Sequence, residues 1–138
     1  MNPRGYDNYK EQSVNSMSTG ELLLLLYDEL VKRSTLADIM LKKKEYPQFE
    51  DAVDRCIAIV KYLDETLDKS YPVSMDIARM YEYFIYTLGR IKIGRNQNLL
   101  DHIRPMLSEF RDTFRQAEKN SLAAPAEAVN PEAMAVSE

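Results

Sequence analysis

The side chains that most often carry out chemistry in proteins are few and isolated in this 138-residue chain. His102 is the single histidine, and no Glu-x-x-His pattern places a second metal ligand beside it on a helix. Cys56 is the single cysteine, and it follows the spacing of apolar residues on a helix, where a thiol behaves as a small hydrophobic group. We therefore expect His102 on or near the surface and Cys56 in the core, with neither acting as a metal ligand or a nucleophile.

Other kinds of chemistry are not indicated either. Gly94-Arg95-Asn96 lacks the pattern of a phosphate-binding loop and is interpreted as a plain connection between helices. The Asp and Glu residues are scattered over helix faces that are expected to be solvated, where their usual role is pairing with neighbouring cations. The sequence thus predicts no catalytic site, no metal and no cofactor, and the chain is not expected to be an enzyme.

Composition narrows the possible partners. The net charge of −4 argues against a general nucleic-acid binder, and the one dense basic cluster, Lys42-Lys43-Lys44, suits the solvated end of a helix. A lone cysteine gives no internal disulfide and no sign of an oxidising compartment. The polar start of the chain lacks the apolar core of a secretory signal, and no apolar run approaches the ~20 residues that span a bilayer. We expect a cytoplasmic protein without membrane insertion.

Four stretches have helical periodicity, over about 19–43, 47–67, 74–94 and 99–118. Ser18 and Glu21 have the spacing of a capping box at the first helix, and Ser74 is the expected N-cap of the third. Asn96 or Asn98 is expected to cap the fourth helix. Pro105 lies inside the fourth pattern, where it predicts a kink or a later start.

The apolar residues of these helices define one core. In the second and third helices they recur at alternating steps of four and three residues, which is typical of helices that pack nearly parallel or antiparallel. These positions are Phe49, Val53, Cys56, Val60, Leu63 and Leu67, then Ile77, Tyr81, Phe84, Leu88 and Ile91. The sequence predicts an all-α fold: an antiparallel up-down-up-down four-helix bundle over 18–119, with a flexible N-terminal arm (1–17) and a disordered tail (120–138).

Apolar residues also occur outside this core. Five consecutive leucines, Leu22 to Leu26, extend all the way round a helix, so only part of the run can face the core. Three of the four helices carry a second apolar strip, and large exposed apolar patches usually mark binding sites. We interpret these strips as a surface for a partner polypeptide, with these candidate binding residues: Leu24, Leu25, Val31, Ile59, Tyr62, Tyr83 and Tyr86.

Several short patterns, in order along 6–117, resemble the bacterial flagellin export chaperones of the FliS family. They are Tyr9-Lys10, Val14-Asn15, Ser18-Thr19-Gly20-Glu21-Leu22, Leu25-Leu26-Tyr27-Asp28, Tyr62 to Asp68, Met80 to Phe84, and Glu109 to Phe114. The resemblance implies a chaperone that binds the disordered C-terminal segment of flagellin in apolar grooves of the bundle. It would prevent premature polymerisation and deliver flagellin to a component of the flagellar secretion gate. It also places the N-terminal arm near the binding surface, which adds Tyr9 and Val14 to the candidate residues.

Alternatives remain at this stage. The off-core apolar surface is also consistent with a self-associating structural bundle, and the chain is expected to be a monomer or a weak homodimer. An adaptor for another secreted client has the same sequence features. A metal-binding or enzymatic bundle would need convergent ligands, which the sequence does not contain.

Overall fold

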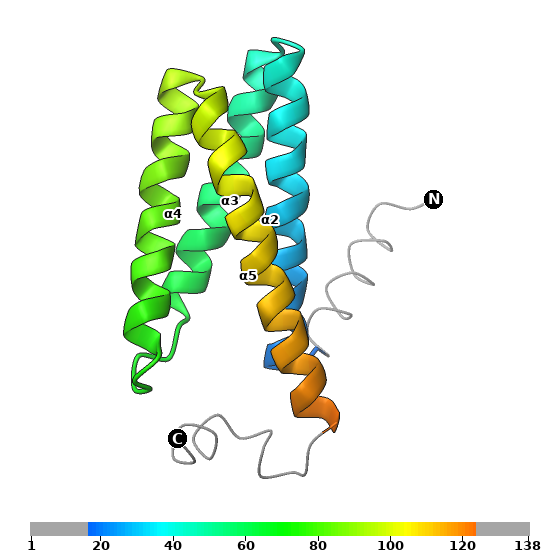
Figure 1. Ribbon diagram of the computed structural model, residues 1–138, viewed down its shortest axis with the longest axis vertical. Coiled ribbons are helices and arrows are strands. Elements are labelled where there is room, and N and C mark those ends of the chain that lie inside the picture. The colour runs from blue at the N-terminus through cyan, green and yellow to red at the C-terminus, as the bar shows by residue number, and fades with distance from the viewer. Residues whose placement is uncertain (1–16, 124–138) are drawn as a thin grey trace, which may run out of the picture.

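The computed structural model describes residues 17–123, and this part of the chain contains four α-helices and no strand (Figure 1). The helices are α2 (Thr19–Lys42), α3 (Tyr46–Glu65), α4 (Ser74–Gly94) and α5 (Gln97–Ala123). They run alternately up and down, so the predicted antiparallel four-helix bundle is confirmed. The predicted arm and tail lie almost wholly outside the described residues. However, α5 continues to Ala123, past the predicted helix end at Glu118.

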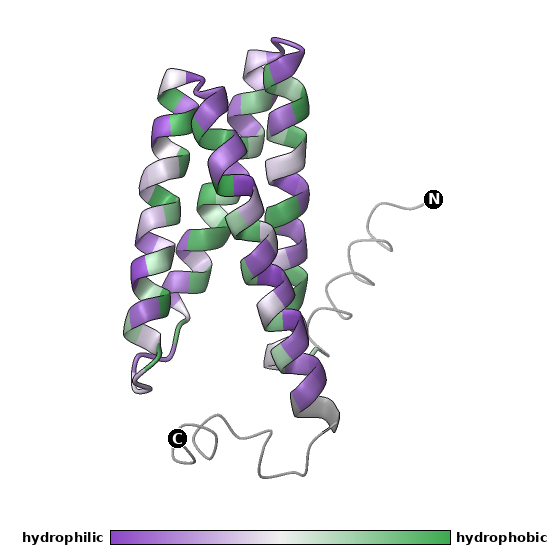
Figure 2. Ribbon diagram, viewed as in Figure 1, coloured by the Kyte–Doolittle hydropathy of each residue, from purple (hydrophilic) through white to green (hydrophobic). Residues whose placement is uncertain are grey.

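Packing in the bundle is centred on α2 and α3. Helix α2 packs against α3 on one side and α5 on the other, and α3 packs against α4 (Figure 1). Helices α4 and α5 approach each other near their connection and then diverge toward the opposite end of the bundle. In Figure 2 the C-terminal half of α5 is mostly hydrophilic, whereas apolar segments lie where the helices meet.

Two of the predicted helix caps are present. The backbone N–H of Glu21 donates to Ser18 Oγ at 3.1 Å, which fixes the start of α2. The backbone N–H of Leu99 donates to Asn96 Oδ1 at 3.0 Å, so Asn96 caps α5. The expected role of Ser74 was wrong. Ser74 is the first residue of α4, and its hydroxyl donates to the backbone carbonyl of Asp68 at 2.5 Å.

Two residues with positive φ lie in the α2–α3 and α4–α5 connections, which are at the same end of the bundle. Lys44 (φ 58°) follows α2, and Arg95 (φ 47°) ends α4 in the left-handed conformation. The Arg95 guanidinium lies 3.7 Å from the centre of the Tyr46 ring, at the start of α3. This cation–π contact ties the α4–α5 connection to the α2–α3 connection.

Most predicted core positions of α3 and α4 are buried, but Leu67 and Ile77 are only half-buried, and Leu67 lies past the end of α3 at Glu65. Helix α2 also has a distinctive buried face. Its buried face contains Tyr27, Leu30, Ser34, Ala37, Asp38 and Leu41. Within the run of five leucines, Leu22, Leu23 and Leu26 are only half-buried. The buried face includes polar residues because each finds a partner inside the bundle. In α5, Leu100 is fully buried, and the helix continues through Pro105 without a later start.

Asp38 is the most heavily paired of these buried polar residues. Its carboxylate accepts from Lys42 Nζ at 3.0 Å and Gln97 Nε2 at 2.7 Å, and lies 3.2 Å from the Arg104 guanidinium. Burial opposes its charged form, but the hydrogen bonds from Gln97 and Lys42 and the charge of Arg104 outweigh burial and lower the pKa of Asp38. The start of α5 is therefore anchored to α2 by charge.

Candidate functional site

The side chains considered first for chemistry have structural or solvated positions. Cys56 is 0% exposed, its thiol lies 3.7 Å from the Leu30 carbonyl oxygen, and burial raises its pKa to about 12. His102 is exposed. Within residues 17–123, no group of three His, Cys, Asp or Glu side chains is arranged to hold a metal ion. The candidate functional site is therefore a surface.

No helix in the described part of the chain is both long and apolar enough to cross a membrane. Seven large apolar side chains of the described residues are exposed. They are Leu25, Ile39, Tyr62, Val73, Met75, Tyr86 and Ile93. More than half of them belong to α4 or immediately precede it, which makes α4 the principal apolar surface of the bundle.

Exposed and half-buried residues form a continuous strip along one side of α4. With about 100° of rotation per residue, steps of three and four keep residues on one side of a helix. Such steps connect Met75, Ala78, Glu82, Ile85, Tyr86, Gly89 and Ile93, which we call the α4 strip. Within it, Tyr86 is 66% exposed and Ile93 is 87% exposed. This side of α4 differs from the side that carries the core residues Tyr81, Phe84 and Leu88.

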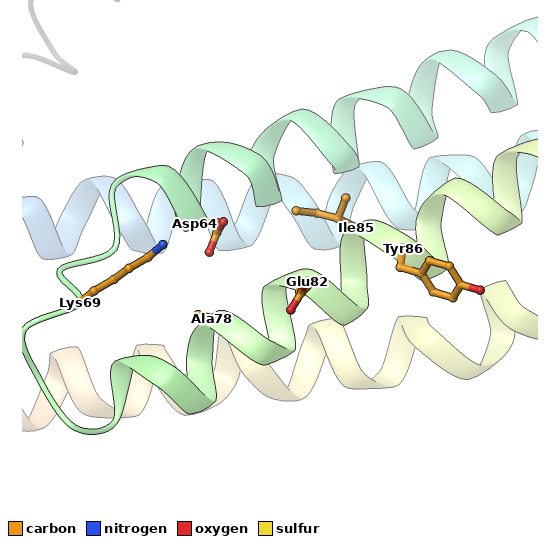
Figure 3. Close-up of a pocket in the computed structure, with 6 residues that line it drawn as sticks. All are labelled: Asp64, Lys69, Ala78, Glu82, Ile85 and Tyr86. Carbon is orange, nitrogen blue, oxygen red and sulfur yellow. The ribbon is translucent and has the colours of Figure 1, made fainter.

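The strip borders an open groove between α3 and α4 (Figure 3). A hollow of about 490 Å³ is lined by Asp64 of α3, Lys69 of the following loop, and Ala78, Glu82, Ile85 and Tyr86 of α4. A second hollow of about 250 Å³ shares Lys69, Ala78 and Glu82 with the first and extends to Met75 and Arg79. We call the two together the α3–α4 groove. It spans about three turns of α4, roughly 16 Å.

Leu24 and Val31, two predicted binding residues, face α5. They lie three or four residues from Asp28 and Thr35, and both of these contact α5. Arg115 donates to Asp28 at 2.7 Å, and Arg104 donates to Thr35 at 3.3 Å. Leu24 and Val31 are half-buried at this boundary. Val31 packs against the buried core, so its apolar area is used at least in part within the bundle.

Three other predicted residues, Leu25 of α2 and Ile59 and Tyr62 of α3, lie at the boundary between α2 and α3. Leu25 precedes Glu29 by one helical turn, and Glu29 and Arg33 lie close enough to Cys56 to influence its pKa, which places this side of α2 next to α3. Ile59 and Tyr62 of α3 lie away from Asp54, which pairs with Lys92 of α4 at 2.8 Å. They therefore face toward α2. Leu25 is 42% and Tyr62 is 43% exposed, so this boundary carries a second apolar area.

The remaining predicted residues separate as well. Tyr86 belongs to the α3–α4 groove, whereas Tyr83 lies about 60° further round α4, outside the strip. Tyr9 and Val14 fall outside the described residues. The structure therefore does not gather the predicted residues into one patch. It distributes those that it describes over the boundaries between neighbouring helices.

Met75, Ala78, Glu82 and Ile93 were missing from the predicted binding residues. Their spacing from Met75 to Ile93 was visible in the sequence. The exposure of these residues could not be predicted from the sequence, because the pattern of a single helix does not tell which of its sides a neighbouring helix covers.

A small helical bundle with apolar grooves between its helices is typical of proteins that hold other polypeptides. Residues 2–121 match the family model described as "Flagellar protein FliS". The chain therefore belongs to the FliS family, as the sequence patterns predicted. It is 27% identical over 112 residues to the "Flagellar secretion chaperone FliS" of Bacillus subtilis (strain 168). The aligned part covers 81% of this chain and 84% of that protein. FliS proteins are chaperones, so the expectation that the chain is not an enzyme is confirmed.

Proposed function

We propose that this flagellar export chaperone binds the C-terminal segment of flagellin in the apolar grooves of its bundle. Binding in the cytoplasm would keep flagellin from polymerising and would present it to a component of the flagellar secretion gate. The observation that carries the proposal is the α4 strip with its groove, in a chain that matches the FliS family over 2–121. An amphipathic helix can bury its apolar side on such a surface.

The distribution of exposed apolar residues supports a client that extends around the bundle. One apolar area lies at the α3–α4 groove, and a second lies between α2 and α3 around Leu25 and Tyr62. A disordered client loses conformational entropy when it folds on binding, which costs about 2–5 kcal/mol or more. A preformed helical surface adds little further loss, because its backbone is already fixed by helix packing.

Titration calorimetry tests this function. The titrant is a peptide of the C-terminal segment of the flagellin from the same organism, and a peptide of equal length from the central part of that flagellin is the control. We expect one-to-one binding of the C-terminal peptide with a large negative heat-capacity change, because apolar surface is buried. Absence of binding, or equal binding of the control peptide, would refute the proposed client.

A further inference from the structure

We propose that the α3–α4 groove selects a client helix that carries lysine or arginine on its polar edge, facing Asp64 and Glu82. This inference rests on the proposed function and adds the chemistry of the segment that the groove prefers. The inference concerns the specificity of the groove. Its apolar lining supplies most of the contact area, and the two carboxylates determine which amphipathic helix fits.

The lining of the groove combines apolar side chains with two carboxylates. Ala78, Ile85 and Tyr86 supply the apolar part along α4. Asp64 approaches from α3 and Glu82 from α4, so the carboxylates belong to both walls (Figure 3). A groove with an apolar lining and nearby charges is complementary to an amphipathic helix whose apolar stripe is flanked by the opposite charge.

Other carboxylates at helix boundaries of this bundle are paired with cations from a neighbouring helix. Asp28 pairs with Arg115 at 2.7 Å, Asp38 with Arg104 at 3.2 Å, and Asp54 with Lys92 at 2.8 Å. These pairs lie at the boundaries between α2 and α5 and between α3 and α4.

Asp64 and Glu82 differ from these paired carboxylates. Within residues 17–123, neither forms an ion pair. Two cations also line the groove: Lys69 from the loop and Arg79 from α4. Arg79 pairs with Asp76 at 3.7 Å, whereas Lys69 is not within ion-pair distance of either groove carboxylate. Among the described residues, the groove lining therefore holds two carboxylates and one lysine that form no ion pair, and this unpaired charge is negative toward an incoming helix.

A second copy of the chain is a poorer occupant than a basic client. A symmetric dimer that joined two α4 strips would bring the same carboxylates of both copies into one interface. Like charges placed together in an interface are unfavourable. Charge complementarity therefore favours a client helix with cationic flanks over self-association on this surface.

The test uses the full chain, the flagellin C-terminal peptide, and variants that neutralise charge with little change of shape. We expect the double variant Asp64→Asn/Glu82→Gln to bind about three- to tenfold more weakly than the wild type at low salt, because rim ion pairs have modest strength. Raising the salt concentration should weaken the wild type and leave the double variant less affected. Lys69→Gln should have the opposite effect and strengthen binding, because it removes a competing cation.

Controls separate failure of this inference from failure of the proposed function. Glu109→Gln removes one negative charge from an exposed position on α5 and should leave the affinity unchanged. A peptide in which Lys and Arg are replaced by Glu should bind Glu82→Lys more tightly than it binds the wild type. If the wild type binds the natural peptide but the charge variants and salt have no effect, the charge selection is wrong and the client assignment stands. If the wild type does not bind that peptide, the client assignment itself fails.

Discussion

The hydroxyl groups of Tyr27 and Tyr81 hydrogen-bond to each other inside the bundle and so join α2 to α4. Tyr27 is 4% exposed and Tyr81 is 3% exposed. Burial raises the pKa of both residues, so both remain neutral donors and acceptors over the physiological range. The Phe110 ring lies 5.8 Å from the Tyr27 ring and 5.9 Å from the Tyr81 ring, which places the pair in an aromatic cluster shared with α5.

Removing both hydroxyls of this pair should cost less than the sum of the two single removals. Tyr81→Phe leaves the buried Tyr27 hydroxyl without its partner, which is expected to lower the free energy of unfolding by about 1–3 kcal/mol. The double variant Tyr27→Phe/Tyr81→Phe should lie closer to the wild type than the sum of the single changes. Denaturant unfolding of the four proteins measures this. Strictly additive losses would show that the two hydroxyls do not act as a pair.

The ion cluster around Asp38 should make stability depend on pH in the acid range. The native pKa of Asp38 is lowered, so its contribution is fully present above its ordinary pKa of about 4 and is lost as pH falls toward its native pKa. Asp38→Asn should lower the free energy of unfolding at neutral pH by about 2 kcal/mol and flatten the acid decline. Denaturant midpoints measured as a function of pH test both effects.

Asp51→Asn is the matched control for this prediction. Asp51 pairs with Arg55 at 3.4 Å, but both side chains are more than half exposed. Its replacement should change stability by less than about 1 kcal/mol. An equal effect of the two Asp→Asn changes would contradict the anchoring role of Asp38.

Glycine should have different effects at the two positive-φ positions. Lys44 is exposed, so Lys44→Gly relieves an unfavourable left-handed conformation and should stabilise the protein by about 0.5–1 kcal/mol. Arg95→Gly gains the same relief but loses the contact with Tyr46, so its net effect should be smaller or negative. Thermal unfolding of both variants distinguishes the outcomes. Equal gains at both positions would show that the Arg95–Tyr46 contact contributes nothing.

Tyr86 is the best single position for testing the groove. The side chain is 66% exposed and lines the α3–α4 groove, so Tyr86→Asp should barely change stability but should weaken client binding by about tenfold or more. Ile39→Asp, on exposed α2 surface away from the groove, introduces the same charge and should weaken binding less. Leu24→Asp is a poorer probe, because it places a carboxylate in the half-buried α2–α5 boundary and should reduce stability. Calorimetry with the client peptide, combined with unfolding measurements, compares the three.

Much of the fold was predictable because its pattern is local. The alternating spacing from Phe49 to Leu63 and from Tyr81 to Ile91 determines which side of α3 and α4 is buried, and the cap at Ser18 depends on neighbouring residues. The buried positions of Tyr27 and Asp38 were not predictable in this way. Their burial depends on partners 54 and 59 residues away in the chain, Tyr81 and Gln97.

The sequence indicated that apolar surface would be left over, but not where the packed helices would expose it. The sequence indicated surplus apolar residues, and the structure does leave Leu25, Tyr62 and Tyr86 substantially exposed. It did not indicate that Leu24 and Val31 pack toward α5, because that depends on contacts such as Asp28–Arg115. The groove also depends on Asp64 and Lys69, which a search for apolar surface passes over.

Hydrogen–deuterium exchange of the full chain, with and without the flagellin C-terminal peptide, tests the central claim most directly. If the peptide docks in the α3–α4 groove, amide exchange should slow most along α4 and the C-terminal half of α3. The polar C-terminal half of α5 should change little. Binding without slower exchange in α4, or with the largest slowing in the C-terminal half of α5, would contradict the assignment of this surface to the client.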